Sequence, residues 1–218
     1  MPLPKYPTLI CSLPRLPANF EQPHVPISRP RLEDRLKMLG DRDGELIRTL
    51  ERFWRWEFCG VDTPPQNLYD RLVAMSGDPE LLECIEILTD IRMLTVAVRS
   101  KILNKKISRP AGRWGAHIVR NWSVPDFGLS VRFPWLTEFR ALLENKQYTQ
   151  GERKVCHVVW REMARIADGH YFDLPALIAY LIRWDLVNRW AVRDPDSGCN
   201  RFDTLVEEAI GDNAGQIQ

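Results

Sequence analysis

The sequence predicts a mainly α-helical protein, an irregular helical bundle with an extended proline-rich N-terminal arm. After residue 31, apolar residues recur at spacings of three and four along most of the chain, which is typical of amphipathic helices. Eight of the sixteen prolines lie within residues 1–30, where they remove too many amide donors for a regular helix. Strand-like patterns are almost confined to the arm and to residues 129–133. We therefore expect an arm over 1–30, a single helical domain over 31–212 and a polar tail over 213–218.

The arm and the first half of the domain contain the clearest local signals. Residues 8–13 are apolar enough to form a short strand or to lie pinned against the domain. At Asp78-Pro79-Glu80, an N-cap residue, a proline at the first helical position and an acid in the first turn mark a helix start. The apolar periodicity predicts helices over residues 31–39, 42–58, 67–75 and 78–102.

The second half begins with an irregular centre, residues 104–134, which prolines and glycines divide into short pieces. Asp168-Gly169 marks a helix end, and Asp173 is placed to cap the last long helix. A turn at 194–198 follows that helix. The pattern predicts helices over 114–122, 135–145, 149–167, 174–192 and 202–210.

Composition excludes several classes of protein. The net charge is +1, with 30 basic and 29 acidic residues, so no overall field favours nucleic acid or an anionic membrane. The five cysteines are far apart and form no CxxC pair, which argues against a disulfide framework and a zinc site. The start has no signal-peptide pattern. The longest apolar stretch, 174–182, is well short of the roughly 20 residues that cross a bilayer. We expect a reducing cytoplasm and no membrane-spanning segment.

No motif of catalytic chemistry is present. The phosphate-binding patterns GxxxxGK[ST] and GxGxxG and the hydrolase pattern GxSxG do not occur. No two of the four histidines are spaced i, i+4. Acidic clusters at 41–45, 83–90 and 207–208 lie on predicted polar faces, so we interpret them as solvated surface. We therefore predict no enzyme, no catalytic or metal-binding residue, no cofactor and no small-molecule substrate. A dispersed active site around His117 or His157 is the alternative.

One charge segregation stands out in this nearly neutral chain. Residues 92–122 contain eight basic residues and no acidic one, whereas residues 194–212 carry six acids against Arg201. Interleaved indoles and cations could stack bases and neutralise phosphates, or they could meet an acidic helix of a protein partner; a solvated basic loop is the third possibility. The eight tryptophans could serve helix packing or an interface. The predicted partner-binding residues are Arg99, Lys101, Lys105, Lys106, Arg109, Arg113, Trp114, Arg120 and Trp122.

Both ends of the chain resemble an uncharacterised family of helical proteins encoded with bacterial V/A-type ATPase subunits. In the arm, Leu9-Ile10-Cys11-Ser12-Leu13-Pro14 is similar to the family's opening, in which an apolar strand runs into Ser-Leu-Pro. Near the other end, Ala179-Tyr180-Leu181 through Asn188-Arg189-Trp190, with Asp194, Gly198 and Phe202, is similar to its closing segment. Residues 104–134 have no counterpart in this resemblance.

The resemblance implies a role like that of the helical subunit that sits on the membrane rotor ring of a rotary ATPase and receives the central stalk. Such a subunit has no active site, binds protein subunits and is cytoplasmic, peripheral to the inner membrane. A nucleic-acid-binding protein that uses the basic stretch is the alternative from a different class.

Overall fold

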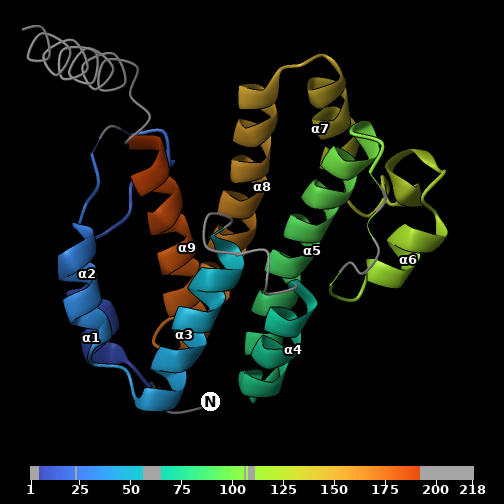
Figure 1. Cartoon of the computed structure of the whole chain (residues 1–218). Helices are drawn as coiled ribbons and strands as arrows, with labels where there is room; N and C mark the ends of the chain where they lie inside the picture. The colour runs from blue at the N-terminus through green and yellow to red at the C-terminus, as the bar shows by residue number, and fades with distance from the viewer. Residues whose placement is uncertain (1–4, 23, 56–64, 106, 108–110, 192–218) are drawn as a thin grey trace, which may run out of the picture.

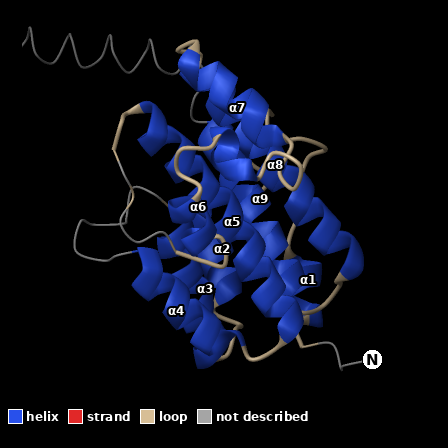
Figure 2. Ribbon diagram, turned by 90° about the vertical axis from the view of Figure 1, so that its right-hand side faces the viewer, coloured by secondary structure: helices blue, strands red, loops and turns tan. Residues whose placement is uncertain are grey.

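The computed structural model describes residues 5–22, 24–55, 65–105, 107 and 111–191 of the 218-residue chain. Across these residues all regular structure is helical, which confirms the mainly α class (Figure 2). The predicted turn at 194–198 and helix at 202–210 lie outside them. The elements are α1 (Pro7–Ser12), α2 (Arg29–Leu36), α3 (Asp41–Trp54), α4 (Pro65–Ser76), α5 (Pro79–Ile102), α6 (Gly115–Arg120), η2 (Pro125–Gly128), α7 (Trp135–Glu144), α8 (Tyr148–Gly169) and α9 (Leu174–Ala191).

Two predicted caps are confirmed in atomic detail. The Asp78 carboxylate accepts a hydrogen bond of 2.7 Å from the backbone N–H of Leu81 and starts α5. The Asp173 carboxylate accepts one of 3.0 Å from the backbone N–H of Ala176 at the start of α9. Each bond satisfies an amide that has no partner within its helix.

Helices α3 and α6 both end earlier than predicted. Helix α3 ends at Trp54, because Arg55 has an extended backbone conformation; residues 56–58 of the predicted helix lie outside the described residues. Helix α6 ends at Arg120, where Asn121 leaves the helical region and its side-chain amide donates a 2.9 Å hydrogen bond to the carbonyl of His117. In both places one non-helical residue overrides a continuing apolar pattern.

Helix α5 is the central element of the bundle. It packs against α3, α4, α7, α8 and α9. Its side chains are buried around most of its circumference, which is typical of a core helix rather than a surface helix. The hydroxyls of Thr89 and Thr95 donate to the carbonyls of Ile85 and Ile91, so these buried polar groups need no external partner.

The remaining helices are arranged around α5. Helices α8 and α9 pack against each other, and α7 packs on α5 and α8. Helices α1 and α2 lie on one side of the molecule near α9, and α6 lies on the opposite side beyond α5 (Figure 1). The buried apolar side chains of these elements form one cluster.

The N-terminal arm lies on the bundle. Of the two alternatives predicted for residues 8–13, a short strand or a segment pinned against the domain, the structure shows the second. Pro7 occupies the first turn of α1, where its missing N–H costs no hydrogen bond. The helix ends at Ser12 because Leu13 precedes Pro14 and is extended, with ψ 132°. The strand prediction was wrong because both prolines favour this short helix.

The rest of the arm is held by buried anchors. Phe20 is fully buried against the rings of Trp160 and Trp190. The Tyr180 hydroxyl donates to the carbonyl of Pro14, and the Trp184 indole donates to that of Ile27. These contacts keep an otherwise extended, proline-rich segment against α8 and α9.

The strand pattern at residues 129–133 was also misleading. The backbone N–H of Phe133 donates to the carbonyl of Leu129 at 2.8 Å, which closes a turn. Leu129 is buried, whereas Val131 is 93 % exposed. A short alternating run forms a strand only beside another strand, and the described part of the chain supplies none.

Candidate functional site

The structure distributes the predicted partner-binding residues over different environments. Lys105 and Arg120 are exposed, and Lys106 and Arg109 lie outside the described residues. Arg99 and Lys101 are half-buried on α5, as are the two indoles, Trp114 and Trp122, before and after α6. Arg113 is exposed in part but is bound within the molecule. These residues therefore do not form one uniform basic face.

Arg113 joins the segment before α6 to α5. Its guanidinium donates to the Asp90 carboxylate at 3.0 and 2.6 Å and also to Glu86. The Trp114 indole N–H donates to the same Asp90 oxygen at 3.2 Å. These charge-assisted hydrogen bonds hold two of the predicted partner-binding residues inside the protein.

Asp90 corrects the interpretation of the acidic cluster at 83–90 as solvated surface. Its side chain is 3 % exposed, on a buried face of α5. Burial raises the pKa of Asp90, and the hydrogen bonds from Arg113 and Trp114 oppose that shift. A carboxylate is tolerated here because Arg113, 23 residues later, folds back onto it.

Gly112 permits this close approach of the loop to α5. It has φ +81°, a conformation that residues with a Cβ rarely adopt. A Cβ at this position would lie 2.6 Å from the Cγ2 atom of Thr89. Glycine at residue 112 thus satisfies both a backbone and a steric requirement next to Arg113.

The two indoles make ring contacts within the chain. Trp114 meets the rings of His117 and Phe133 edge to face, with centroids 5.7 and 5.8 Å apart. Trp122 packs against Phe127 at 5.4 Å. Both tryptophans therefore contribute to packing around α6, one of the two roles expected from the composition.

Lys101 is directed to the turn after α6. Its ammonium group donates a 2.6 Å hydrogen bond to the carbonyl of Val124 and lies 5.1 Å from the centre of the Phe127 ring. Burial lowers the pKa of Lys101, and the nearby Arg140 guanidinium lowers it further. This cation is used to hold the chain in place.

The turn itself is strained. Asp126 and Phe127 have φ values of 50° and 56°, in the left-handed region that non-glycine residues seldom occupy. Such residues cost about 1–3 kcal/mol each and persist only where the surroundings fix them. Here the Asp126 carboxylate accepts hydrogen bonds from Thr137 and Arg140 at 2.9 and 2.7 Å, and the carbonyl of Phe127 bonds His117 at 3.0 Å.

We name six exposed residues of the segment between 103 and 131, on both sides of α6 in the chain, the α6 surface. Four of its residues are large apolar side chains with exposed fractions between 40 % and 93 %. Two more are exposed cations. The members are Leu103, Lys105, Val119, Arg120, Val124 and Val131. Exposed apolar side chains close in the chain to cations, on a segment that ion pairs to buried carboxylates hold, are suited to contact with another protein.

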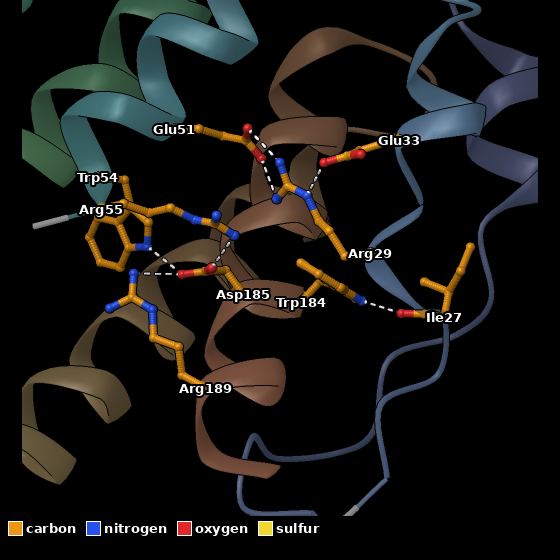
Figure 3. A network of polar contacts seen from close by, with 9 residues as sticks. All are labelled: Ile27, Arg29, Glu33, Glu51, Trp54, Arg55, Trp184, Asp185 and Arg189. Atoms are coloured by element: carbon orange, nitrogen blue, oxygen red, sulfur yellow. Dashed lines mark hydrogen bonds and ion pairs between the residues drawn. The ribbon is translucent and has the colours of Figure 1, made fainter. Parts of the chain in front are cut away.

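A second polar network, which sequence reasoning missed, ties α3 to α9 (Figure 3). The Asp185 carboxylate, 6 % exposed, accepts hydrogen bonds from the Trp54 indole at 3.1 Å and from Arg55 at 3.0 Å. Arg189, one helical turn later, forms an ion pair with it at 2.6 Å. The sequence signal that could have indicated this network is a single acid within an apolar helix, followed four residues later by an arginine.

Near the Asp185 network, Arg29 connects α2 to α3. Its guanidinium donates to both oxygens of Glu51 on α3, at 2.9 and 3.0 Å, and to Glu33 on its own helix (Figure 3). Helices α2, α3 and α9 are thereby connected by buried or half-buried ion pairs, which restrict their relative motion.

The histidines on α8 and at its end, which we considered as candidates for catalysis or metal binding, contact other side chains of the protein. His157 lies 3.4 Å from Glu21 and contacts the Phe20 ring in a tilted arrangement, and His170 bonds the capping carboxylate of Asp173 at 2.7 Å. No group of three or more potential metal ligands occurs in the described ranges. Among the described helices none is long and apolar enough to cross a membrane.

Comparison with known proteins gives one match. A family model described as "Protein of unknown function (DUF2764)" matches residues 74–211, which is more than half of the chain. The matched range begins in α4 and includes α5, α6 and the helices that follow. No curated protein and no solved structure matches the chain.

Proposed function

The chain belongs to the DUF2764 family, and from this premise we propose that it is a non-catalytic coupling or assembly subunit of a V/A-type rotary ATPase. In this role it would link the central stalk to the membrane rotor by protein–protein contacts. It would lie on the cytoplasmic side and be held at the inner membrane through its partners. The link to the ATPase comes from the resemblance of both ends of the chain to proteins encoded with its subunits.

The α6 surface is the observation that supports a protein-binding role. Val131, Leu103, Val119 and Val124 are half of the exposed large hydrophobic side chains found in the described part of the chain, although the segment that carries them is short. Exposed aliphatic groups gain about 25 cal/mol for each Å² buried, so a partner could draw binding energy from them. Lys105 and Arg120 add positive charge beside them.

Rigidity is the second requirement of a subunit that transmits torque. The Asp185 network joins α3 to α9, and the Arg113–Asp90 bonds join the α6 segment to the central helix α5. A partner that pushes on the α6 surface would therefore move α5 with it. This argument supports coupling rather than a flexible tether.

Nucleic acid binding is the competing proposal, and the geometry gives it less support. Trp114 and Trp122 are packed against rings of their own chain, whereas bases stack on aromatic faces that are free. Arg113 is neutralised by Asp90 and Glu86. If nucleic acid binds, retardation should appear at low salt and weaken steeply as salt rises.

Native affinity purification tests the proposal. Tagged full-length chain expressed at its normal level should recover ATPase head and rotor subunits. The double variant Val119→Asp and Val131→Asp should reduce that recovery by about tenfold or more, because two apolar contacts are replaced by buried charge. Tyr148→Asp, at an exposed residue on α8, is the matched control and should not. Recovery of no ATPase subunit by the folded wild-type chain contradicts the proposal.

A further inference from the structure

A groove of about 430 Å³ lies between α5 and α8 and is lined by none of the six residues that define the α6 surface, although Val131 precedes the lining residue Arg132 in the chain. Its walls come from the first half of α5 and the second half of α8, and residues 132–134 and Trp135, the first residue of α7, also line it. Two of the lining residues, Arg165 of α8 and Glu83 of α5, form an ion pair at 3.3 Å. The groove is thus bounded by two helices and a loop that the core fixes.

The groove combines an apolar floor with a charged rim. Ile87 and Ile91 line it from α5, Val158 lines it from α8, Phe133 lines it from the loop and Trp135 from the start of α7. Ile87 and Phe133 are only partly buried. An apolar side chain of another molecule could therefore cover surface that water now contacts.

The carboxylates that line the groove all have close partners. Asp90 is bound by Arg113 at 2.6 Å, and Glu83 and Glu162 both lie 3.3 Å from the guanidinium of Arg165. The acids of the groove are thus matched by two of its four arginines. The guanidiniums of the other two arginines determine which charge a ligand of the groove should carry.

The other two arginines of the groove are Arg132 and Arg161. Arg161 is highly exposed, with its side chain at 72 %, and its one ion pair to a described residue is with its neighbour Glu162 at 3.6 Å, beyond hydrogen-bond distance. Arg132 is exposed, and its guanidinium carbon lies 5.9 Å from the ring centroid of its neighbour Phe133. Among the described residues no carboxylate is paired with Arg132.

We propose that this groove binds an acidic segment of a partner protein, with carboxylates on Arg132 and Arg161 and an apolar side chain on the floor between the two helices. Guanidinium groups bind carboxylates with two parallel hydrogen bonds, which gives both energy and direction. The inference rests on the proposed function in taking the partner to be a subunit of the same assembly. It assigns a contact made by other residues than those of the α6 surface, next to Val131 in the chain.

A peptide fits the groove better than a nucleic acid does. Glu83 and Glu162 lie among the arginines that line the groove, so a continuous row of phosphates would meet carboxylates as well as guanidiniums. A peptide can instead place its carboxylates only at the two available guanidiniums and its aliphatic groups on the floor. The charge pattern of the rim therefore selects a partner with spaced acids.

Fluorescence anisotropy with the full-length chain tests the proposal. The probe is a labelled 14-residue peptide with glutamate and leucine at helical spacing. Its comparison molecules are the same peptide with glutamine for glutamate and a labelled single-stranded 12-nucleotide DNA. We expect the acidic peptide to bind at low salt, and the double variant Arg132→Glu and Arg161→Glu to weaken it about tenfold or more, since both attractive charges become repulsive.

The double variant Arg31→Glu and Arg35→Glu, at two exposed arginines of α2, is the matched control and should change the affinity by less than about twofold. Absence of binding, equal binding of the glutamine peptide, unchanged affinity in the groove variant or tighter binding of the DNA would overturn the proposal. Failure of the groove with intact recovery of ATPase subunits refutes this inference alone. Lost recovery with a groove that binds the acidic peptide refutes only the proposed function.

Discussion

Replacing Asp185 with asparagine tests whether the network between α3 and α9 holds the bundle together. The carboxylate is 6 % exposed and is shared by Trp54, Arg55 and Arg189. Asparagine keeps the volume but removes the charge and places an amide donor near two guanidiniums. Trp54 and Arg189 both contact Oδ2 of the carboxylate, whereas Arg55 bonds Oδ1, so the single oxygen of asparagine leaves either that pair of donors or Arg55 without its acceptor.

The magnitude follows from burial. Removing one partner of a buried ion pair costs about 3–5 kcal/mol. The side chains of Arg55 and Arg189 are 23 % and 27 % exposed, so water can partly solvate them after the change. We therefore expect the lower end, a loss of about 3 kcal/mol in the free energy of unfolding, from a total that is usually about 5–15 kcal/mol.

Urea unfolding followed by tryptophan fluorescence and circular dichroism measures this loss. In a chain of this size it corresponds to a decrease of about 6–12 °C in Tm. Asp70→Asn is the control, because the Asp70 carboxylate is exposed on α4 and accepts a hydrogen bond from Gln66; it should change stability by less than about 0.5 kcal/mol.

A double-mutant cycle with Arg189→Met separates the network from a general effect of burial. The two substitutions should be non-additive by about 0.5–3 kcal/mol, because they remove the same ion pair. A loss below about 1 kcal/mol for Asp185→Asn, or strict additivity in the cycle, would refute the reasoning.

Three further predictions concern the arm and the loop before α6. Phe20→Ala should cost about 3–5 kcal/mol in urea unfolding, because it empties a fully buried site beneath the arm. Gly112→Ala should destabilise by about 1–3 kcal/mol and clearly more than Gly128→Ala, since both have positive φ but only Gly112 has a neighbour within 3 Å of a new Cβ. The hydrogen bond from Arg153 lowers the pKa of Glu21, so its stabilisation is present above pH 4.5 and is lost as pH falls through the folded pKa; Glu21→Gln should flatten that part of the stability–pH curve.

The basic stretch shows what a charge pattern can and cannot predict. The stretch has eight cations, but Arg113 is bound to Asp90, one of the acids that the sequence pattern led us to interpret as solvated. Lys101 is bound to a backbone carbonyl. Whether a charged side chain meets solvent, a partner or its own chain depends on contacts across 23 residues or more, and no local pattern encodes them.

In the arm, by contrast, the local sequence predicts part of the structure. Its apolar run and prolines predicted a segment pinned on the domain or a strand, and residues 7–12 form a pinned helix. Pro7 favours a helix start and Pro14 an extended residue before it, so the helix bounds follow from local rules. The surface on which the arm lies, with Trp160 and Trp190 under Phe20, follows from packing alone.

The sequence by itself determined the helical class, the positions of most helices and the caps at Asp78 and Asp173, because helix periodicity and capping act within a few residues. Tertiary structure alone decided that α5 is the central helix, that Asp90 and Asp185 are buried ion-pair acceptors, and that two arginines face a groove between α5 and α8. Burial and charge pairing are properties of segments far apart in the chain that meet only in the folded state.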